Sequence, residues 1–114
     1  MLKAEGPVDK RWRETYVVSM KVEGFLWDDD NVEHIARHDV YPFEVEEVFE
    51  ARNYTYRVKG KRGDERFVAL GQTLDGRYLT VVWALRERLV YVITARDSTQ
   101  SERRLLQKRG KGRR

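Results

Sequence analysis

The chain has 114 residues, of which 40% are hydrophobic and 37% are charged. A chain of this length suits a single domain, with enough aromatic and aliphatic residues for a core without covalent cross-links. Because it contains no cysteine, a disulfide scaffold, a thiolate zinc site and a cysteine nucleophile are excluded. No apolar run approaches the roughly 20 residues of a membrane-spanning helix, and the start lacks a hydrophobic signal core, so we expect a cytoplasmic protein.

Acidic and basic residues occupy different parts of the chain. The net charge is +4, but residues 28–50 hold nine acids and one base, whereas residues 51–114 hold seventeen bases and six acids. This segregation predicts a basic face that can bind a polyanion such as nucleic acid, and an acidic face elsewhere. The alternative is that the charges intermingle once the chain folds.

Hydrophobic patterning is weak at the start of the chain. We therefore expect residues 1–19 to be an N-terminal extension of a domain that spans residues 20–109. Residues 22–27 have the pattern of a strand. At Asp28-Asp29-Asp30 the pattern changes to that of a helix. Asp30 and Glu33 have the spacing of a capping box, and acids there interact well with the helix dipole.

A second helix is predicted to begin at Pro42, which suits the first turn of a helix. After it the hydrophobic period becomes two, which predicts four strands. These strands are expected at residues 54–59, 66–73, 78–85 and 89–96. Asp75-Gly76 predicts the hairpin between the second and third of them, since a type I′ turn requires positive φ at both central positions.

A last helix is predicted from Thr99 and Glu102, which again have capping-box spacing, with Leu105 and Leu106 to anchor it. Residues 110–114 are expected to be a disordered basic tail. The predicted order is β-α-α-β-β-β-β-α. It describes an α+β domain whose meandering antiparallel sheet carries helices mainly on one face.

His34 and His38 lie four residues apart on the first predicted helix, a spacing at which two imidazoles can bind one metal ion. No motif supplies a third ligand, so we favour solvated or locally hydrogen-bonded histidines. At about 100° per residue, His38 flanks the buried face and His34 points mostly to water. Since histidine titrates near neutrality, His38 is a candidate general acid or base, with a partly buried helix cap as the alternative.

The segment from Arg96 to Thr99 joins the end of a central strand to the start of the last helix. The first turn of a helix offers free N–H groups, the Thr99 hydroxyl can bond a phosphate oxygen, and Arg96 supplies a bidentate donor. Structural N-capping explains Thr99 and Glu102 equally well but leaves Arg96 unexplained, so we favour a phosphate site. Arg66 begins a neighbouring strand and could project towards the same site.

Four further bases have the spacing of residues that follow a nucleic-acid backbone, although a solvated loop is their simpler explanation. They are Arg57, Lys59, Lys61 and Arg62.

A series of segments carries a pattern known from one protein family. In the N-terminal half the segments are Trp27-Asp28, Ile35-Ala36-Arg37-His38-Asp39-Val40 and Phe43-Glu44-Val45-Glu46-Glu47-Val48-Phe49. In the C-terminal half they are Gly63-Asp64-Glu65-Arg66-Phe67, Leu70-Gly71, Asp75-Gly76-Arg77 and the run from Thr94 to Arg103. In order and spacing, this series resembles BrnT-type toxins over about residues 20–109.

The resemblance implies a small ribonuclease toxin of a type II toxin–antitoxin pair, with a fold similar to RelE-like toxins. Such toxins cut RNA without a metal or other cofactor. Their antitoxin is a DNA-binding protein that covers the toxin and represses the operon, and the complex is expected to be oligomeric. The polar residues that match recurrent family positions are His38, Arg66, Arg96, Thr99 and Arg103.

Two positions depart from the family pattern. Asp39 stands where many relatives have glycine, and Trp83-Ala84-Leu85 replaces a more polar end of that strand. Either departure points to altered substrate choice or a weakened enzyme.

Cleavage of RNA by its own 2′-hydroxyl needs a base, donors for the charge on phosphorus, and an acid for the leaving 5′-oxygen. We predict His38 as the base or acid, with Glu102 as the alternative base. Arg66 and Arg96 would bind the phosphate, and Thr99 would position it. The alternative function is a module on the same fold that binds RNA or a partner without catalysis.

Overall fold

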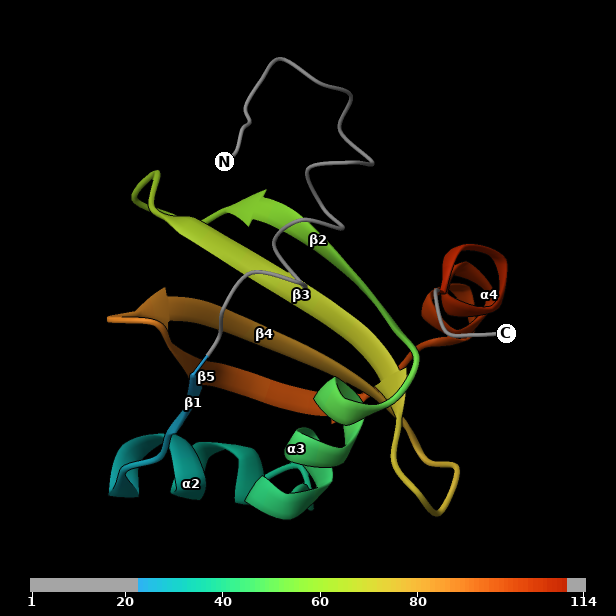
Figure 1. Ribbon diagram of the computed structural model, residues 1–114, viewed down its shortest axis with the longest axis horizontal. Helices are drawn as coiled ribbons and strands as arrows, with labels where there is room; N and C mark the ends of the chain where they lie inside the picture. The colour runs from blue at the N-terminus through green and yellow to red at the C-terminus, as the bar shows by residue number, and fades with distance from the viewer. Residues whose placement is uncertain (1–22, 111–114) are drawn as a thin grey trace.

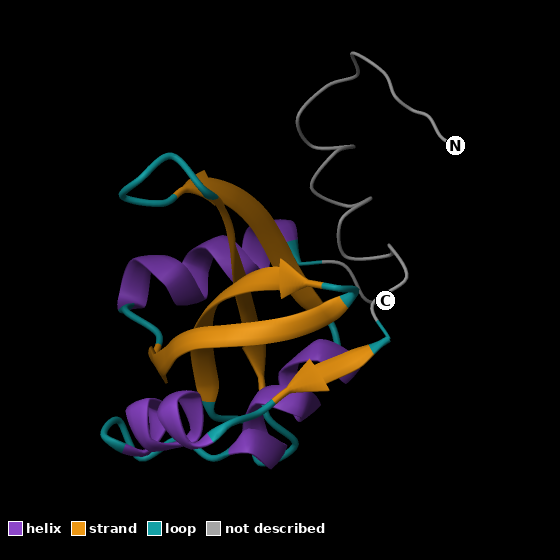
Figure 2. Ribbon diagram, turned by 90° about the vertical axis from the view of Figure 1, so that its left-hand side faces the viewer, coloured by secondary structure: helices purple, strands orange, loops and turns teal. Residues whose placement is uncertain are grey.

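A five-stranded sheet lies at the centre of the protein, with helices on both of its faces (Figures 1 and 2). The computed structural model describes residues 23–110. The elements are β1 (Gly24–Leu26), α2 (Asp29–Ala36), α3 (Pro42–Glu50), β2 (Asn53–Lys59), β3 (Glu65–Gln72), β4 (Tyr78–Arg86), β5 (Leu89–Asp97) and α4 (Gln100–Arg109). This confirms the predicted α+β class and element order. None of the described helices is long and apolar enough to cross a membrane.

The predicted domain boundaries stay predictions. The extension of residues 1–19 lies outside the described residues, and so does the basic tail apart from Gly110.

The strands are ordered β1-β5-β4-β3-β2 across the sheet. Strands β2 to β5 form the predicted antiparallel meander. The short β1 adds to it in parallel, with Gly24 opposite Leu89 and Leu26 opposite Tyr91. The sheet is therefore mixed, and β4 is its central strand.

The N-cap of helix α2 lies two residues before the predicted one. The N-cap is Asp28, whose Oδ1 accepts a hydrogen bond from the Asn31 backbone N–H at 2.9 Å, while Asn31 Oδ1 accepts from the Asp28 N–H at 2.8 Å. The prediction of an Asp30–Glu33 capping box is therefore wrong. The capping box forms with Asn31 because this side chain is also buried, at 2% exposed. Its Nδ2 donates a hydrogen bond to the carbonyl of Leu26, which joins the helix to β1.

The turn between α2 and α3 contains Asp39 in the left-handed region, with φ of 59°. Glycine adopts this conformation without the steric cost that a side chain carries. Asp39 therefore matters to the turn through its left-handed backbone conformation. Helix α3 then begins at Pro42, as predicted, and Glu44 Oε1 accepts a hydrogen bond from the Tyr41 N–H at 3.1 Å.

The two faces of the sheet carry cores of different size. Helices α2 and α3 cover the larger core, which includes Ile35, Val45, Val48 and Trp83. Trp83 is 1% exposed, and its ring centroid lies 4.6 Å from that of Phe67. Trp83 is therefore a core residue. Helix α4 covers a smaller core on the opposite face, formed by Val68, Leu70 and Leu106.

The hairpin turns differ from the prediction in detail. In the predicted type I′ turn Asp75-Gly76, only Gly76 has positive φ, at 89°. Positive φ at both central positions occurs instead at Glu87 and Arg88, 52° and 71°, which join the paired residues Arg86 and Leu89 at the end of the β4–β5 ladder. A two-residue link between twisted strands selects this geometry even without glycine.

Arg88→Gly should stabilise the protein, because glycine adopts positive φ without the strain of a side chain. The gain is reduced by the greater freedom of glycine in the unfolded chain, leaving an expected rise of about 0.5–1 kcal/mol in the free energy of unfolding. Urea denaturation measures it. Arg88→Ala is the control, because it also removes the exposed 3.4 Å ion pair to Glu23 but keeps the strain. Equal unfolding free energies for the two variants would contradict the prediction.

Candidate active site at the β5–α4 junction

Three of the predicted site residues meet where β5 ends and α4 begins. The Nη1 and Nη2 atoms of Arg96 donate to Glu102 Oε1 and Oε2, each at 2.9 Å. Glu102 Oε1 also accepts from the Thr99 backbone N–H at 2.8 Å, and Thr99 Oγ1 accepts from the Glu102 N–H at 3.2 Å. The predicted capping box is therefore confirmed, and the same carboxylate holds Arg96 in place.

Thr80 completes this cluster, although the sequence analysis did not identify it. Its hydroxyl donates to Glu102 Oε1 at 2.9 Å and shares a 2.8 Å hydrogen bond with the hydroxyl of Ser98. Thr80 pairs with Arg96 across β4 and β5, so both side chains project from the same face of the sheet. A polar residue inside an apolar strand was the available signal.

The cluster strongly favours the ionised form of Glu102. The hydrogen bond from Arg96, followed by those from the Thr99 N–H and the Thr80 hydroxyl, lowers the pKa of Glu102 to about 2 despite its burial. The same hydrogen bond raises the pKa of Arg96. Because such an acidic carboxyl is a weak base, the geometry favours Glu102 as a positioning residue over a proton acceptor.

Arg77 is the most highly connected side chain near the junction, and the sequence analysis did not single it out. Its Nε donates to Asp97 Oδ1 at 2.8 Å, and its Nη1 donates to the Asp39 carbonyl at 2.7 Å and to Glu44 Oε1 at 3.2 Å. Its Nη2 donates to the carbonyl of His38 at 3.2 Å. Arg77 therefore joins the α2–α3 turn to the end of β5.

The positive charge of Arg77 and the negative charge of Asp97 stabilise each other. The hydrogen bond to Asp97 raises the pKa of Arg77 and lowers the pKa of Asp97. The only sequence signal for Arg77 was its place directly after Asp75-Gly76. Two of its four acceptor residues contribute main-chain carbonyls, and residue type does not reveal such acceptors.

His38 lies in the turn after α2, and its side chain is exposed, whereas His34 is partly buried. The predicted orientations are therefore wrong, because α2 ends at Ala36 and the helical angle does not extend to His38. The His38 N–H still donates to the Ile35 carbonyl, at 2.9 Å. The His34 and His38 rings lie 6.1 Å apart, and the described residues contain no group of three side chains suited to a metal ion.

Arg66 shares a face of the sheet with Arg96 but lies at the other end of its strands. Along β4, Arg96 is opposite Thr80, whereas Arg66 comes one residue before Phe67, which is opposite Trp83. The offset is about 13 Å along the strand direction. Arg66 Nε donates to Asp64 Oδ2 at 2.9 Å, so the structure does not bring the two arginines together.

The four bases predicted to bind RNA surround the β2–β3 hairpin. Alternation along β2 points Arg57 and Lys59 to the sheet face opposite Arg96, and Arg57 donates to Glu65 at 2.7 Å. Lys61 and Arg62 are exposed in the hairpin loop. Their role stays a prediction.

Arg103 lies on α4 beside the junction. Its guanidinium carbon is 4.5 Å from the ring centroid of Tyr78. The pKa of Asp97 is lowered mainly by Arg77, and the charge of Arg103 adds a smaller effect in the same direction. Among the described residues no carboxylate forms an ion pair with Arg103, unlike Arg96.

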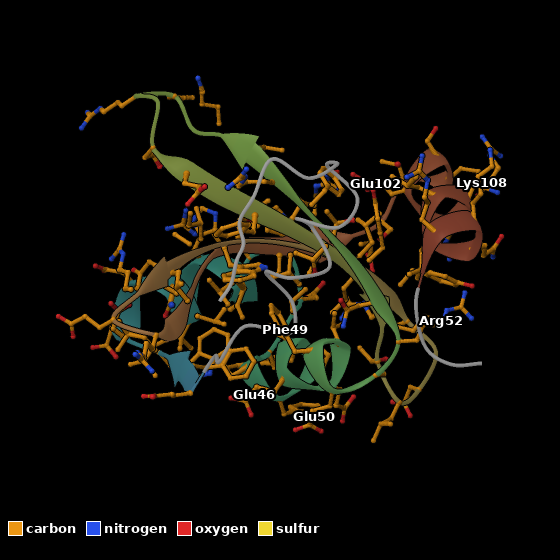
Figure 3. The ribbon with its side chains drawn as sticks, turned by 45° about the horizontal axis from the view of Figure 1, so that its top comes forward. Glu46, Phe49, Glu50, Arg52, Glu102 and Lys108 are labelled. Atoms are coloured by element: carbon orange, nitrogen blue, oxygen red, sulfur yellow. The ribbon has the colours of Figure 1, made fainter. Side chains whose placement is uncertain are left out.

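The predicted charge segregation is retained by the helices. Acidic residues such as Glu46 and Glu50 lie along α3, and bases such as Lys108 lie along α4, well apart from α3 (Figure 3). Since α3 and α4 cover opposite faces of the sheet, the protein presents an acidic and a basic helix on different sides.

Fold and site together define a small α+β protein with an arginine-rich cluster at a strand–helix junction. Residues 27–102 match the family described as ribonuclease toxin BrnT of type II toxin–antitoxin systems. The match covers about two thirds of the chain, which therefore belongs to the BrnT family of ribonuclease toxins. No match is found among curated proteins.

The low pKa of Glu102 predicts a pH-dependent contribution to stability. The ionised Glu102 carboxylate makes its full contribution to stability at pH values above its ordinary pKa of 4.5. This contribution is lost as the pH falls towards the lowered pKa of about 2. Because Glu102 is 19% exposed and Arg96 is 41% exposed, solvent reduces the contribution to about 2 kcal/mol.

Urea denaturation of the wild type and of Glu102→Gln measures the effect. The pH range runs from roughly 6 to roughly 2.5, because it must start above the ordinary pKa of Glu102 and approach the lowered one. We expect the wild-type advantage to shrink as the pH falls. Glu33→Gln is the control, since Glu33 is exposed on α2. An advantage of Glu102 that stays constant over this range would rule out the assigned pKa shift.

Proposed function

We propose that this chain is a metal-independent endoribonuclease toxin that cleaves RNA by attack of a 2′-hydroxyl on the adjacent phosphate. Membership of a ribonuclease toxin family supports the activity. The observation that carries the site assignment is the guanidinium of Arg77, which binds both the Asp97 carboxylate and the His38 carbonyl. It ties the segment that holds the candidate histidine to the junction that holds Arg96.

The phosphate would bind at the N-terminus of α4. Arg103 is best suited to contact it, because among the described residues no carboxylate forms an ion pair with Arg103, and its guanidinium rests on Tyr78. Arg96 would contribute second, since Glu102 already neutralises it and fixes its orientation. Cationic groups held in advance around a phosphate stabilise the charge that develops on its oxygens during cleavage.

Proton transfer would fall to His38. Its side chain is exposed in the turn that Arg77 joins to the end of β5, which supports a role in which the imidazole would face the sugar–phosphate of bound RNA. It would take the 2′-hydroxyl proton or give one to the leaving 5′-oxygen. Arg66 is offset by about 13 Å along the β-strand direction by the usual residue rise. It would contact a phosphate further along the same RNA chain.

The partner would be a cognate DNA-binding antitoxin that neutralises the toxin in an oligomeric complex. The family pairs each toxin with an antitoxin, which supports a protein partner. A non-catalytic RNA-binding module on this fold is the second candidate, favoured by the ion pairing that occupies Arg96 and Arg66.

Arg103→Ala should lower the rate of RNA cleavage about 100-fold, because it removes a charge placed on the reacting phosphate. Purified protein is incubated with single-stranded RNA in EDTA, and the products are examined for 2′,3′-cyclic phosphate ends. Arg104→Ala is the matched control, since Arg104 is the next residue on α4 and is exposed. Equal losses for the two variants would remove the assignment, and wild-type protein that shifts RNA in a gel without cutting it would establish the binding module.

His38→Ala should lower kcat by about 100-fold or more and remove one limb of the pH–rate profile, as loss of a general acid or base does. His34→Ala, on the preceding turn of α2, is the control and should keep both limbs. The profile is measured from pH 5 to pH 9, on the order of two units either side of neutrality where histidine titrates. A His38→Ala variant that keeps the wild-type profile would transfer the proton steps to another residue.

A further inference from the structure

All the exposed large hydrophobic side chains of the described chain lie in one corner of the molecule. Tyr41 is 52% exposed, Phe43 is 60% exposed and Leu74 is 82% exposed. Tyr41 and Phe43 flank the first residue of α3, whereas Leu74 is in the loop between β3 and β4. We call these three side chains the corner patch.

The loop between β3 and β4 lies beside α3 in Figure 1, and two contacts join the loop to the helix. Glu47 Oε1 accepts a hydrogen bond from the Leu74 N–H at 3.0 Å, and Glu44 pairs with Arg77 at 3.2 Å. Glu47 is one helical turn after Phe43, so both side chains lie on the same face of α3. The corner patch therefore combines two segments that are distant in sequence and that these contacts join.

Four acidic residues lie next to the residues of the corner patch, either in sequence or through these contacts. They are Asp39, Glu44, Glu47 and Asp75. Arg77 is the base that lies among them, and Glu44 and Asp97 already bind its charge. The rim of the patch is therefore negative.

This charge decides what the aromatic side chains can bind. Exposed aromatics beside a ribonuclease site could stack RNA bases, but the phosphates of RNA would then lie against the carboxylates of the rim. A protein segment with apolar anchors and lysine or arginine at its edges suits the same surface, because its charges complement the rim.

We infer that the corner patch is the docking surface for the antitoxin, and that it receives a cationic amphipathic segment of that partner. The inference rests on the antitoxin partnership that the proposed function includes. Apolar side chains of the segment would cover Phe43 and Leu74, and its basic residues would face the carboxylates of the rim.

The position of the patch also explains how such a partner would affect the active site. Arg77 touches Glu44 on the rim, the carbonyl of His38 and the carboxylate of Asp97. A segment bound at the corner patch would thus lie beside the His38 turn, where it blocks the approach of RNA without occupying the arginine cluster itself.

The test measures binding to the antitoxin encoded beside this chain in its operon, by biolayer interferometry with separately purified proteins. The Phe43→Ser, Leu74→Ser double variant should bind about 100-fold more weakly, because buried apolar anchors dominate interface energies. Both side chains are exposed, so the variant should keep the wild-type unfolding free energy and the wild-type rate of RNA cleavage in the absence of antitoxin.

Charge is tested by a matched pair. Asp75→Lys on the rim should weaken binding roughly three- to tenfold, mainly through the association rate and most strongly at low salt. Glu33→Lys, an equal charge change on α2 away from the patch, should leave the affinity unchanged.

Three results would overturn the inference. One is wild-type antitoxin affinity in the double variant. A second is loss of RNA cleavage in that variant with antitoxin affinity intact, which would assign the patch to RNA. The third is a wild-type dimer in sedimentation that the double variant turns into a monomer at unchanged antitoxin affinity, which would assign it to a second copy. Because affinity is measured without RNA, a chain that binds antitoxin but does not cut RNA contradicts only the proposed catalysis.

Discussion

The guanidinium of Arg77 is the interaction on which the geometry of the candidate site depends. It binds main-chain carbonyls in the α2–α3 turn, a carboxylate at the start of α3 and a carboxylate at the end of β5. Its side chain is only 26% exposed, so its donors need partners within the protein. The acceptors for these donors come from the α2–α3 segment and from the end of β5. Arg77 therefore sets the position of the His38 turn relative to the β5–α4 junction.

A second constraint acts within the junction. Arg96 and Glu102 form a bidentate pair, and the same carboxylate closes the N-terminus of α4 through Thr99. The orientation of Arg96 and the start of the helix are therefore fixed by one group. Such coupling suits a site that must hold charged donors in place before a phosphate arrives.

Those parts of the fold that depend on neighbours in sequence could be predicted. The alternation from Tyr54 onwards predicted the meander, and the spacing of Thr99 and Glu102 predicted the start of α4. At the start of α2, three consecutive aspartates all suit an N-cap. Asp28 takes this position because Asn31, three residues later, is buried against β1. The type I′ turn at Glu87 and Arg88 could not be predicted from local preference, because the length of the link between β4 and β5 imposes it.

The candidate site was predictable to the same degree. Arg96, Thr99 and Glu102 come together because they are near neighbours at a helix start. Arg66 does not join them, since the register of β3 against β4 carries it to the far end of the sheet. Arg77 could not be found from residue type alone, because two of its acceptors are carbonyls, and these carry no signal in a sequence. The orientation of His38 depended on where α2 ends, which was set by the left-handed turn at Asp39.

The parallel pairing of β1 with β5 bears on how the protein is made. The first described strand finds its partner only when Leu89 to Tyr91 have been synthesised, and the arginine cluster follows directly after that partner. Contacts between residues so distant in sequence form late in folding. A nascent chain that stalls before β5 therefore lacks both the complete five-stranded sheet and the candidate site at the β5–α4 junction.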